Sequence, residues 1–552
     1  MTMKYQHFTS VLLAIALLFA ACNPWDEHTA LGDKNLGKNM VDLIADQEEL
    51  STFAALLQQY GYDQTLADMS SCTVFAPVNA AWEGIDTNDS VLVKGILGSM
   101  ITNLKIRSND STYTGKILAI NGKAVSFDAS EKSFEGISIQ TPDLAAANGM
   151  LHLMGAVSKR KDNVWEALDK LTQYKQVRYL LSMNTQVIDL DKSVPSGLDE
   201  NGKITYDPIV MKDYNPLLEK YPLDNEKEVI TYFIVEDAAY DAMTAKYAPC
   251  FRMEKQQTLA GDSVVWTFDA ALTDSIAAFN LCGDYVLPFL LEEDSLQKSQ
   301  LTNYDGIKIP FNNALVKEVI DCSNGYIYIL SECNISLKNK IRPIRIEGEN
   351  FNSCMNPFNL ATRYKSWASA GYDVMLYGKS KFENFPTQQF TGTSSSASNL
   401  FNGTNYYIEY LANVNSVNYA IYYVAYDDYE GHDGLALEQK LFVSMPNRAK
   451  LSKKNATDSV ANNYLGNARC FVGSSWAATP NPERVRLTQW DLDASAPTQF
   501  LVAEVKGQDA KVMTVPTMGE LTMWLCNTTR YSAENAGFMF LDYIELVPIV
   551  ND

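Results

Sequence analysis

The sequence has few of the residues that serve as catalytic bases or zinc ligands. Only four histidines occur in 552 residues, and two of them, His7 and His28, lie near the N-terminus. None of the nine cysteines forms a CxxC pair, and no histidine stands near a cysteine at the spacing of a zinc site. The GxSxG motif of nucleophile-elbow hydrolases is also absent from the sequence. A zinc site and nucleophilic catalysis of this kind are therefore poorly supported.

Positive charge is in deficit. The chain has 45 Lys and Arg against 66 Asp and Glu, which gives a formal net charge of −21. Such a surface repels the phosphates of nucleic acids and anionic lipids. We therefore expect no nucleic-acid partner.

No apolar run is long enough to span a bilayer. The run VLLAIALLFA (11–20) is too short for a transmembrane helix and is typical of a signal peptide, predicted here over residues 1–21. It ends in LFAAC, which resembles a bacterial lipobox. The resemblance implies that Cys22 becomes the acylated first residue, anchored by about 0.8 kcal/mol per buried methylene. The alternative is an ordinary signal peptide followed by a chance cysteine.

The residues after Cys22 favour a tether. Residues 22–38 are rich in Asn, Gly, Asp and Lys, and Asp26 and Glu27 resemble the acidic surface-export signal of some diderm-bacterial lipoproteins. These features predict a protein held by lipid on the outer membrane and exposed at the cell surface. In such a protein the other eight cysteines could form disulfides or remain buried thiols, and the sequence leaves both possibilities open.

Residues 39–162 have the pattern of a first domain. Helical spacing over 41–60 ends at Gly61, and TVFAPVNAAW (73–82) indicates a buried strand followed by a helix that Asn79 can cap. LAINGKAVSF (118–127) predicts a hairpin with a two-residue Asn-Gly turn. NGMLHLMGAV (148–157) predicts a turn and a last strand.

This ordered set resembles the fasciclin domain over about residues 36–160. The resemblance implies a compact β-fold with packed helices that serves adhesion or ligand binding rather than catalysis. A histidine often occupies the place of His152 in this family and supports the fold through hydrogen bonds. We expect the same structural role here.

Residues 163–340 are predicted to be a second, more diverged copy. WEALDKLTQYKQVRYLL (165–181) corresponds to the leading helix, and ITYFIVEDAAYDAM (230–243) to the strand-to-helix switch, with Glu236 or Asp237 as cap. NGYIYILSEC (324–333) corresponds to the last strand, with Tyr328 in place of the histidine. The first motif recurs after 158 residues and the second after 176, so we expect extra chain in the middle, at about 244–300.

The pattern changes after residue 340. Segments such as 406–414 and 419–428 are rich in aromatic residues and alternate with period two, and about eight short strands predict a β-sandwich over 341–552. The ending FLDYIELVP resembles the last strand of galactose-binding-type jelly rolls, a group with many carbohydrate-binding modules. The alternative is another kind of sandwich. The predicted fold class is thus two fasciclin-like domains, α+β, followed by an all-β jelly roll.

Two candidate sites lie in this last region. Flat aromatic rings stack on sugars, and the candidate ligand-binding residues are Trp476, Trp367, Tyr406 and Tyr429, although a core position is the usual place for a single aromatic. The acidic stretch DDYEGHDG carries four carboxylates that could hold a structural Ca²⁺, although its spacing matches no EF-hand loop and a solvated hairpin tip is the favoured interpretation. These carboxylates belong to Asp427, Asp428, Glu430 and Asp433.

Together these patterns predict a non-enzymatic cell-surface lipoprotein. Its partner would be a glycan or an outer-membrane protein, in adhesion or in glycan uptake. The alternative is a structural accessory subunit of an outer-membrane transporter complex that has no ligand of its own.

Overall fold

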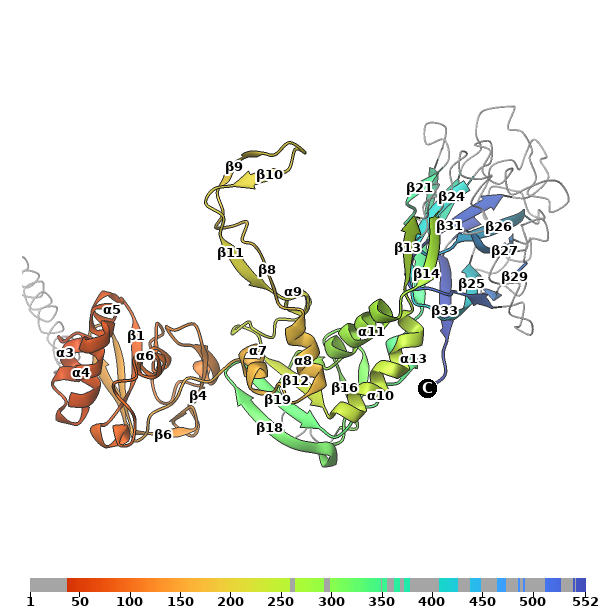
Figure 1. Ribbon diagram of the computed structural model, residues 1–552. Helices are drawn as coiled ribbons and strands as arrows, with labels where there is room; N and C mark the ends of the chain where they lie inside the picture. Colours follow the sequence, from red (N-terminus) through yellow and green to blue (C-terminus); the bar gives the residue numbers. More distant parts are fainter. Residues whose placement is uncertain are drawn as a thin grey trace, which may run out of the picture.

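The computed structural model shows three regions that follow one another along the chain (Figure 1). It describes residues 37–258, 264–291, 298–348, 350–354, 362–367, 372–377, 407–424, 437–447, 464–472, 485–486, 490–491, 512–527, 540–541 and 543–552. We call α3 to β7 the first unit and α7 to α13 the second unit, and the strands after them the C-terminal region.

The first unit is a seven-stranded sheet covered by helices. Its strand order is β2-β1-β7-β6-β5-β4-β3, and β1 and β7 run parallel to each other. The helices are α3 (Met40–Ala45), α4 (Ser51–Tyr60), α5 (Tyr62–Asp68) and α6 (Ser90–Ser99), with 3₁₀ turns at Glu48–Leu50, Asn79–Trp82 and Ser111–Tyr113. The strands are β1 (Cys72–Pro77), β2 (Ile101–Thr102), β3 (Gly115–Leu118), β4 (Ala124–Asp128), β5 (Ser133–Phe134), β6 (Ile137–Ala146) and β7 (Gly149–Met154).

The second unit repeats the central part of this sheet. Its order β15-β12-β19-β18 matches β2-β1-β7-β6, and β12 runs parallel to β19 over six residue pairs, as β1 does with β7. The strands are β12 (Ile230–Val235), β15 (Val286–Leu287), β18 (Val316–Cys322) and β19 (Gly325–Leu330), beside a hairpin of β16 (Gln300–Thr302) and β17 (Lys308–Pro310). The helices are α7 (Val164–Ala167), α8 (Lys175–Ser182), α9 (Pro216–Lys220), α10 (Asp237–Tyr247), α11 (Ala270–Asp284) and α13 (Leu337–Lys340), with 3₁₀ turns at Leu168–Lys170, Ala248–Phe251 and Asn313–Leu315.

Each unit has an asparagine whose hydrogen bonds connect distant parts of that unit, and we call this residue the asparagine clamp. In the first unit, the Asn148 amide accepts from Met40 N at 2.8 Å and donates to Leu66 O and Met69 O at 3.0 and 3.1 Å. Its backbone carbonyl accepts from Cys72 N. One residue thus joins the start of the leading helix and the end of α5 through its side chain, and the central strand through its backbone carbonyl.

The second unit has the same clamp. The Asn324 amide accepts from Val164 N at 2.8 Å and donates to Leu223 O and Asn225 O at 2.9 and 3.2 Å, and its carbonyl accepts from Ile230 N. The following glycine is needed in both units because the neighbouring strand is too close for a Cβ. A Cβ on Gly149 would lie 2.1 Å from Cys72 O, and one on Gly325 would lie 1.7 Å from Ile230 O.

The sequence predicts the capping residues, but the prediction of which helix each one caps is wrong. Asn79 Oδ1 accepts from Thr52 N at 2.9 Å, in the first turn of α4, and not from its own 3₁₀ turn. Asp237 Oδ1 likewise accepts from Lys175 N at 2.7 Å, at the start of α8, and Glu236 makes no side-chain cap. We call Asn79 and Asp237 the switch residues, because each lies where the central strand gives way to a helix. In both units the switch residue therefore connects the end of the central strand to a helix distant in sequence.

Two further predictions need correction in detail. The leading helices are each broken in two, as α3 and α4 and as α7 and α8. The hairpin at 118–127 is confirmed, but its loop has three residues, because Ala119 N donates to Lys123 O across it. Gly122 has a φ of +80° and closes a turn on Ala119 O, as is common in three-residue loops. Gly61 ends α4 in the left-handed conformation, as predicted.

Two insertions distinguish the second unit. A hairpin of β13 (Glu254–Thr258) and β14 (Val264–Phe268) lies within the range where extra chain is predicted. The other insertion is a β-arm between α8 and α9, which sequence analysis does not anticipate. It consists of β8 (Thr185–Ile188), β9 (Pro195–Leu198), β10 (Ile204–Tyr206) and β11 (Met211–Tyr214).

The described strands of the C-terminal region form three antiparallel sheets. Their orders are β20-β33-β25-β28 with β30 beside β25, β21-β24-β31-β26-β27-β29, and β22-β23-β32. The bounds are β20 (Ile344–Glu347), β21 (Ser353–Cys354), β22 (Thr362–Trp367), β23 (Tyr372–Tyr377), β24 (Tyr407–Val414), β25 (Asn418–Val424), β26 (Leu437–Ser444), β27 (Tyr464–Val472), β28 (Val485–Arg486), β29 (Trp490–Asp491), β30 (Met513–Thr514), β31 (Gly519–Asn527), β32 (Phe540–Leu541) and β33 (Tyr543–Ile549). A strand-rich region is thus confirmed, and the jelly-roll topology stays a prediction.

The C-terminal region is seated on the second unit. Ser416 Oγ donates to Pro249 O at 2.6 Å and accepts from Arg252 N at 2.9 Å. The chain end returns to the same unit, because Asp552 accepts from Ser336 Oγ and from Leu337 N at the start of α13. The five cysteines whose side chains are described, namely Cys72, Cys250, Cys282, Cys322 and Cys333, are free and buried. For these five, the buried-thiol alternative is the correct one.

Candidate functional site: the groove between the units

The β3–β4 hairpin of the first unit reaches the second unit through Lys123. Its ammonium lies 2.7 Å from Glu226 Oε1 and 2.5 Å from Glu166 Oε2, and its side chain is only 10% exposed. Glu226 also accepts from Ala124 N at 3.0 Å and from Ser323 Oγ at 3.0 Å. One glutamate thus bonds the hairpin of one unit to two segments of the other.

A second ion cluster crosses the same junction. Lys161, in the segment between the units, lies 2.6 Å from Glu135 Oε2 and 2.5 Å from Asp321 Oδ2. Glu135 belongs to the first unit and its side chain is almost fully buried. Arg160 beside it pairs with Glu166 at 2.7 Å. The connecting segment is therefore bonded to both units rather than loose.

The charges at the junction stabilise one another. Burial opposes the charge of Lys161, but hydrogen bonds to Asp321 and Glu135 hold its pKa above the ordinary lysine value. Burial also acts against the Glu166 carboxylate, but Lys123 and the Asn163 backbone N–H lower its pKa. Lys161 and Glu166 are thus held in their charged forms by their partners across the junction.

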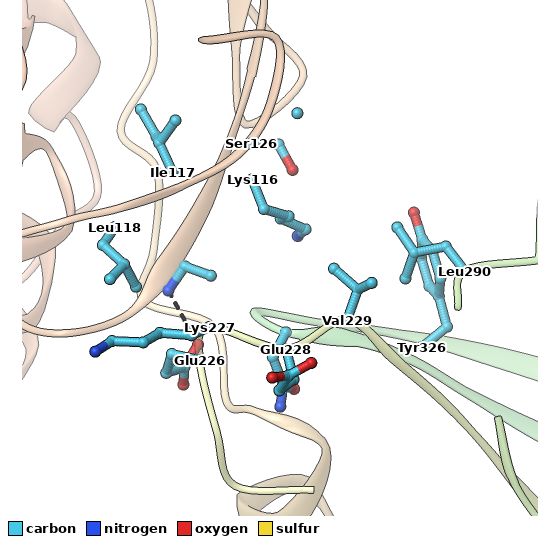
Figure 2. A pocket seen from close by; sticks show the side chains of 13 residues that line it. Lys116, Ile117, Leu118, Ser126, Glu226, Lys227, Glu228, Val229, Leu290 and Tyr326 are labelled. Carbon is cyan, nitrogen blue, oxygen red and sulfur yellow. Dashed lines mark hydrogen bonds between the residues drawn. The ribbon is translucent and has the colours of Figure 1, made fainter. Parts of the chain in front are cut away.

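A groove of roughly 600 Å³ opens beside this network. The hairpin forms one wall, and the segment before β12 forms the other, together with residues from β19 and the loop after β15 (Figure 2). The wall of the first unit consists of Gly115, Lys116, Ile117, Leu118, Ala124 and Ser126, and that of the second unit of Glu226, Lys227, Glu228, Val229, Leu290, Asn324 and Tyr326.

The groove combines an apolar patch with a half-buried lysine. Val229, Leu290 and Tyr326 lie together on the side of the second unit, across from Lys116 (Figure 2). Burial lowers the pKa of Lys116, although Glu135 and Asp321 partly offset this effect. Its ammonium lies 3.5 Å from Cys322 O. The lining thus combines apolar side chains with a few charged and polar ones, which is typical of a binding groove.

Among the predicted site residues, Trp367 alone lies within the described part of the chain. Cys22, Trp476, Tyr406, Tyr429 and the four carboxylates Asp427, Asp428, Glu430 and Asp433 lie outside the described residues. Trp367 ends β22, where it is paired in register with Tyr372 of β23. The groove was not anticipated, since its residues are distant in sequence and follow no motif.

His152 has the structural role that the sequence predicts. It is fully buried, Nδ1 accepts from Asp143 N at 3.1 Å, and Nε2 lies 3.0 Å from Ile106 O. Burial lowers its pKa, so the ring is neutral at pH 7. Tyr328 occupies the same register position in the second unit, opposite Phe233 as His152 is opposite Phe75.

Comparisons with known proteins agree with this architecture in part. No curated protein matches the chain. Among solved structures, the FAS1 domain pair of the insect cell adhesion molecule fasciclin I is similar at 13% identity, with a TM-score of 0.20, over 53% of this chain and 98% of that one. A TM-score of this size does not establish a common overall arrangement.

Among the described residues, no helix is both long and apolar enough to cross a bilayer. The comparison with family models is more specific than the comparison with solved structures. Residues 48–157 match the model of the fasciclin domain, which is the region that carries the β1–β7 ladder and the Asn148 clamp. The N-terminal part of this chain therefore contains a fasciclin domain.

Proposed function

We propose that this chain is a non-enzymatic binding or adhesion protein of the cell surface. The observation that carries the proposal is the fasciclin domain at 48–157, because such domains are typically adhesion or binding modules. We extend it to the second unit, whose strand order, parallel ladder and asparagine clamp are the same, and propose that this unit is a second fasciclin-type domain.

The contacts at the junction agree with a role of the two units as a rigid spacer. The clusters around Lys123 and Lys161 connect the two units, and the hydrogen bonds of Ser416 connect the second unit to the C-terminal region. A protein built in this way holds its far end at a fixed distance from its attachment point. In the proposal, that attachment is lipid on Cys22 in the outer membrane of a diderm bacterium, with residues 22–38 as tether.

The C-terminal region is proposed to hold the ligand-binding surface. Its strand-rich make-up agrees with a galactose-binding-like jelly roll, and its candidate ligand is a glycan contacted by Trp476 and Trp367. A structural Ca²⁺ at 427–433 belongs to the same proposal. The groove between the units is proposed as a second contact for a ligand or a partner protein.

Glycan-array binding and pull-down of outer-membrane proteins by the full chain test this proposal. We expect binding that is lost in Trp476→Ala at an unchanged melting temperature. Absence of any glycan binding, together with co-purification of a transporter, would instead favour the accessory-subunit alternative. Turnover of a substrate by the purified chain would contradict both. A Cys22→Ala variant that still fractionates with membranes would refute the lipid anchor.

A further inference from the structure

The β-arm of the second unit stands away from the other elements (Figure 1). It is a two-stranded ribbon in which β8 pairs with β11 and, beyond a bend, β9 pairs with β10. The bend is ordered by hydrogen bonds, such as Asp189 N to Val210 O at 2.8 Å and Asp207 N to Val194 O at 2.8 Å. An isolated ribbon of two strands is only marginally stable in water, so an extra partner would stabilise it.

The fold of the unit does not require the arm. In the first unit, the equivalent helices α4 and α5 are joined by the single residue Gly61, and the same central ladder forms. In the second unit, 33 residues connect the end of α8 at Ser182 to the start of α9 at Pro216, and the arm spans most of them. The arm is therefore an addition with a purpose of its own.

The arm exposes many large apolar side chains. Leu198 is 68% exposed, Leu190 63% and Ile209 57%. Further exposed residues of the same kind are Ile188, Val194, Ile204 and Met211. Apolar residues concentrated on a projecting element mark a surface that is covered in an assembly.

The free edge of β8 can accept another strand. Hydrogen-bonded residues alternate along an antiparallel ladder, and Asp189 bonds to β11, so Val187 and Thr185 also face β11. The backbone groups of Gln186 and Ile188 therefore point outward. Among the described residues, no strand pairs with this edge. It also lacks the Lys or Pro that commonly protects an edge strand.

We propose that β8 pairs antiparallel with β8 of a second copy of this chain. A two-fold axis at Val187 places Gln186 opposite Ile188 of the other copy, so that their outward backbone groups bond in both directions. The same register makes the two Ile188 side chains diagonal neighbours on one face, beside Met211, their partner in the β8–β11 ladder.

Charge favours a second copy on this edge. The strand Thr185–Ile188 has no charged residue, so identical strands meet without repulsion. Beyond it, the two-fold register sets Asp189 opposite Thr185 and Asp191 opposite Met183, so no carboxylate faces another. The outer edge of β11, by contrast, carries Lys212 and Asp213. Because the whole chain has a net charge of −21, we expect the dimer to strengthen when salt is added.

Two proline variants of the full chain test the proposal by sedimentation velocity. Gln186→Pro removes an outward N–H without touching the bonds between β8 and β11, and Asp213→Pro does the same on the opposite edge, at the position paired with Gln186. We expect a dimer at micromolar concentration that Gln186→Pro weakens about 10- to 100-fold, since both copies lose a hydrogen bond. Asp213→Pro should leave it unchanged, and both variants should melt as the unmodified chain does.

Cysteine cross-linking gives a second readout. Val187→Cys should form a disulfide-linked dimer on mild oxidation with diamide, because the two substituted residues face each other, and Lys212→Cys should not. If the unmodified chain is monomeric, the proposal is overturned. Binding of a different protein to the arm would not rescue it. Equal effects of the two proline variants, or equal cross-linking at both positions, would overturn it as well.

Discussion

The first and second units show which parts of this architecture are needed and which can change. Both keep the parallel central ladder, the asparagine clamp and a switch residue that bonds to a helix far away in sequence. They differ in the insertions and at the position occupied by His152 in one unit and Tyr328 in the other. The ladder and the side-chain bonds to backbone groups at fixed places thus recur in both units, whereas the buried polar ring differs between them.

The largest expected effect comes from filling the space beside the central strand. Gly325→Ala places a methyl group 1.7 Å from Ile230 O, and Gly149→Ala places one 2.1 Å from Cys72 O. Backbone cannot move aside as a side chain does, so each variant should lose about 3 kcal/mol or more of unfolding free energy in chemical denaturation. Gly95→Ala, whose new Cβ meets nothing closer than 3.5 Å, is the matched control. A neutral Gly325→Ala would contradict the close approach.

The asparagine clamp should come next. Asn324→Ala leaves the buried Val164 N–H and two carbonyls without their partner, which should cost about 2–4 kcal/mol. Asn148→Ala should cost a similar amount, because its three bonds are equivalent. Urea titrations of both variants measure this. Costs that differ by several kcal/mol would show that the two clamps are not equivalent.

A smaller effect is expected at the junction. Glu226→Gln weakens the pair with Lys123 but leaves Glu166 in place, so we expect a loss of about 1–2 kcal/mol. The loss should appear as looser coupling, with the two units melting separately in calorimetry. A double-mutant cycle with Lys123→Met isolates the pair. Simple additivity of the two changes would argue against direct coupling across the junction.

The smallest expected effect is a pH dependence of stability that His152 gives to the first unit. The folded-state pKa of His152 lies below its ordinary value of about 6.5, so the unfolded chain takes up a proton first as the pH falls. The first unit should therefore lose stability as the pH falls through about 6.5, the ordinary pKa of histidine. In His152→Gln this pH dependence should disappear, as measured by melting temperature at pH values above and below that value. Retention of the full slope would assign it to other groups.

The sequence predicts the repeat because its key residues are adjacent along the chain. Asn148 with Gly149 and Asn324 with Gly325 stand directly before their strands, and Gly61 ends a helix by its backbone conformation alone. Partners such as Lys123 and Glu226 are far apart, and no local spacing connects them. The sequence predicts Asn79 as a cap but not which helix it caps, because its partner Thr52 comes near it only in the folded chain.

The arm was missed for a related reason. Its strands are short, and apolar and polar residues do not alternate along them. Neither face of the ribbon packs on a core among the described elements, so nothing requires such alternation. Patterns of alternation detect strands packed against a core, and they lose force where the covering partner is another molecule. The contrast between Gly61 and the arm is visible only when the two folded units are compared.

Replacement of the arm tests the central claim, that the second unit is the first unit's fold with an added interaction element. Thr185 and Tyr214 are paired across the ribbon, so two glycines can replace residues 185–214 without strain. We predict that calorimetry of this variant gives a melting temperature within a few degrees of the unmodified chain. Unfolding of the second unit at the temperature where the unmodified chain is still folded would contradict the claim, because the arm would then be part of the fold.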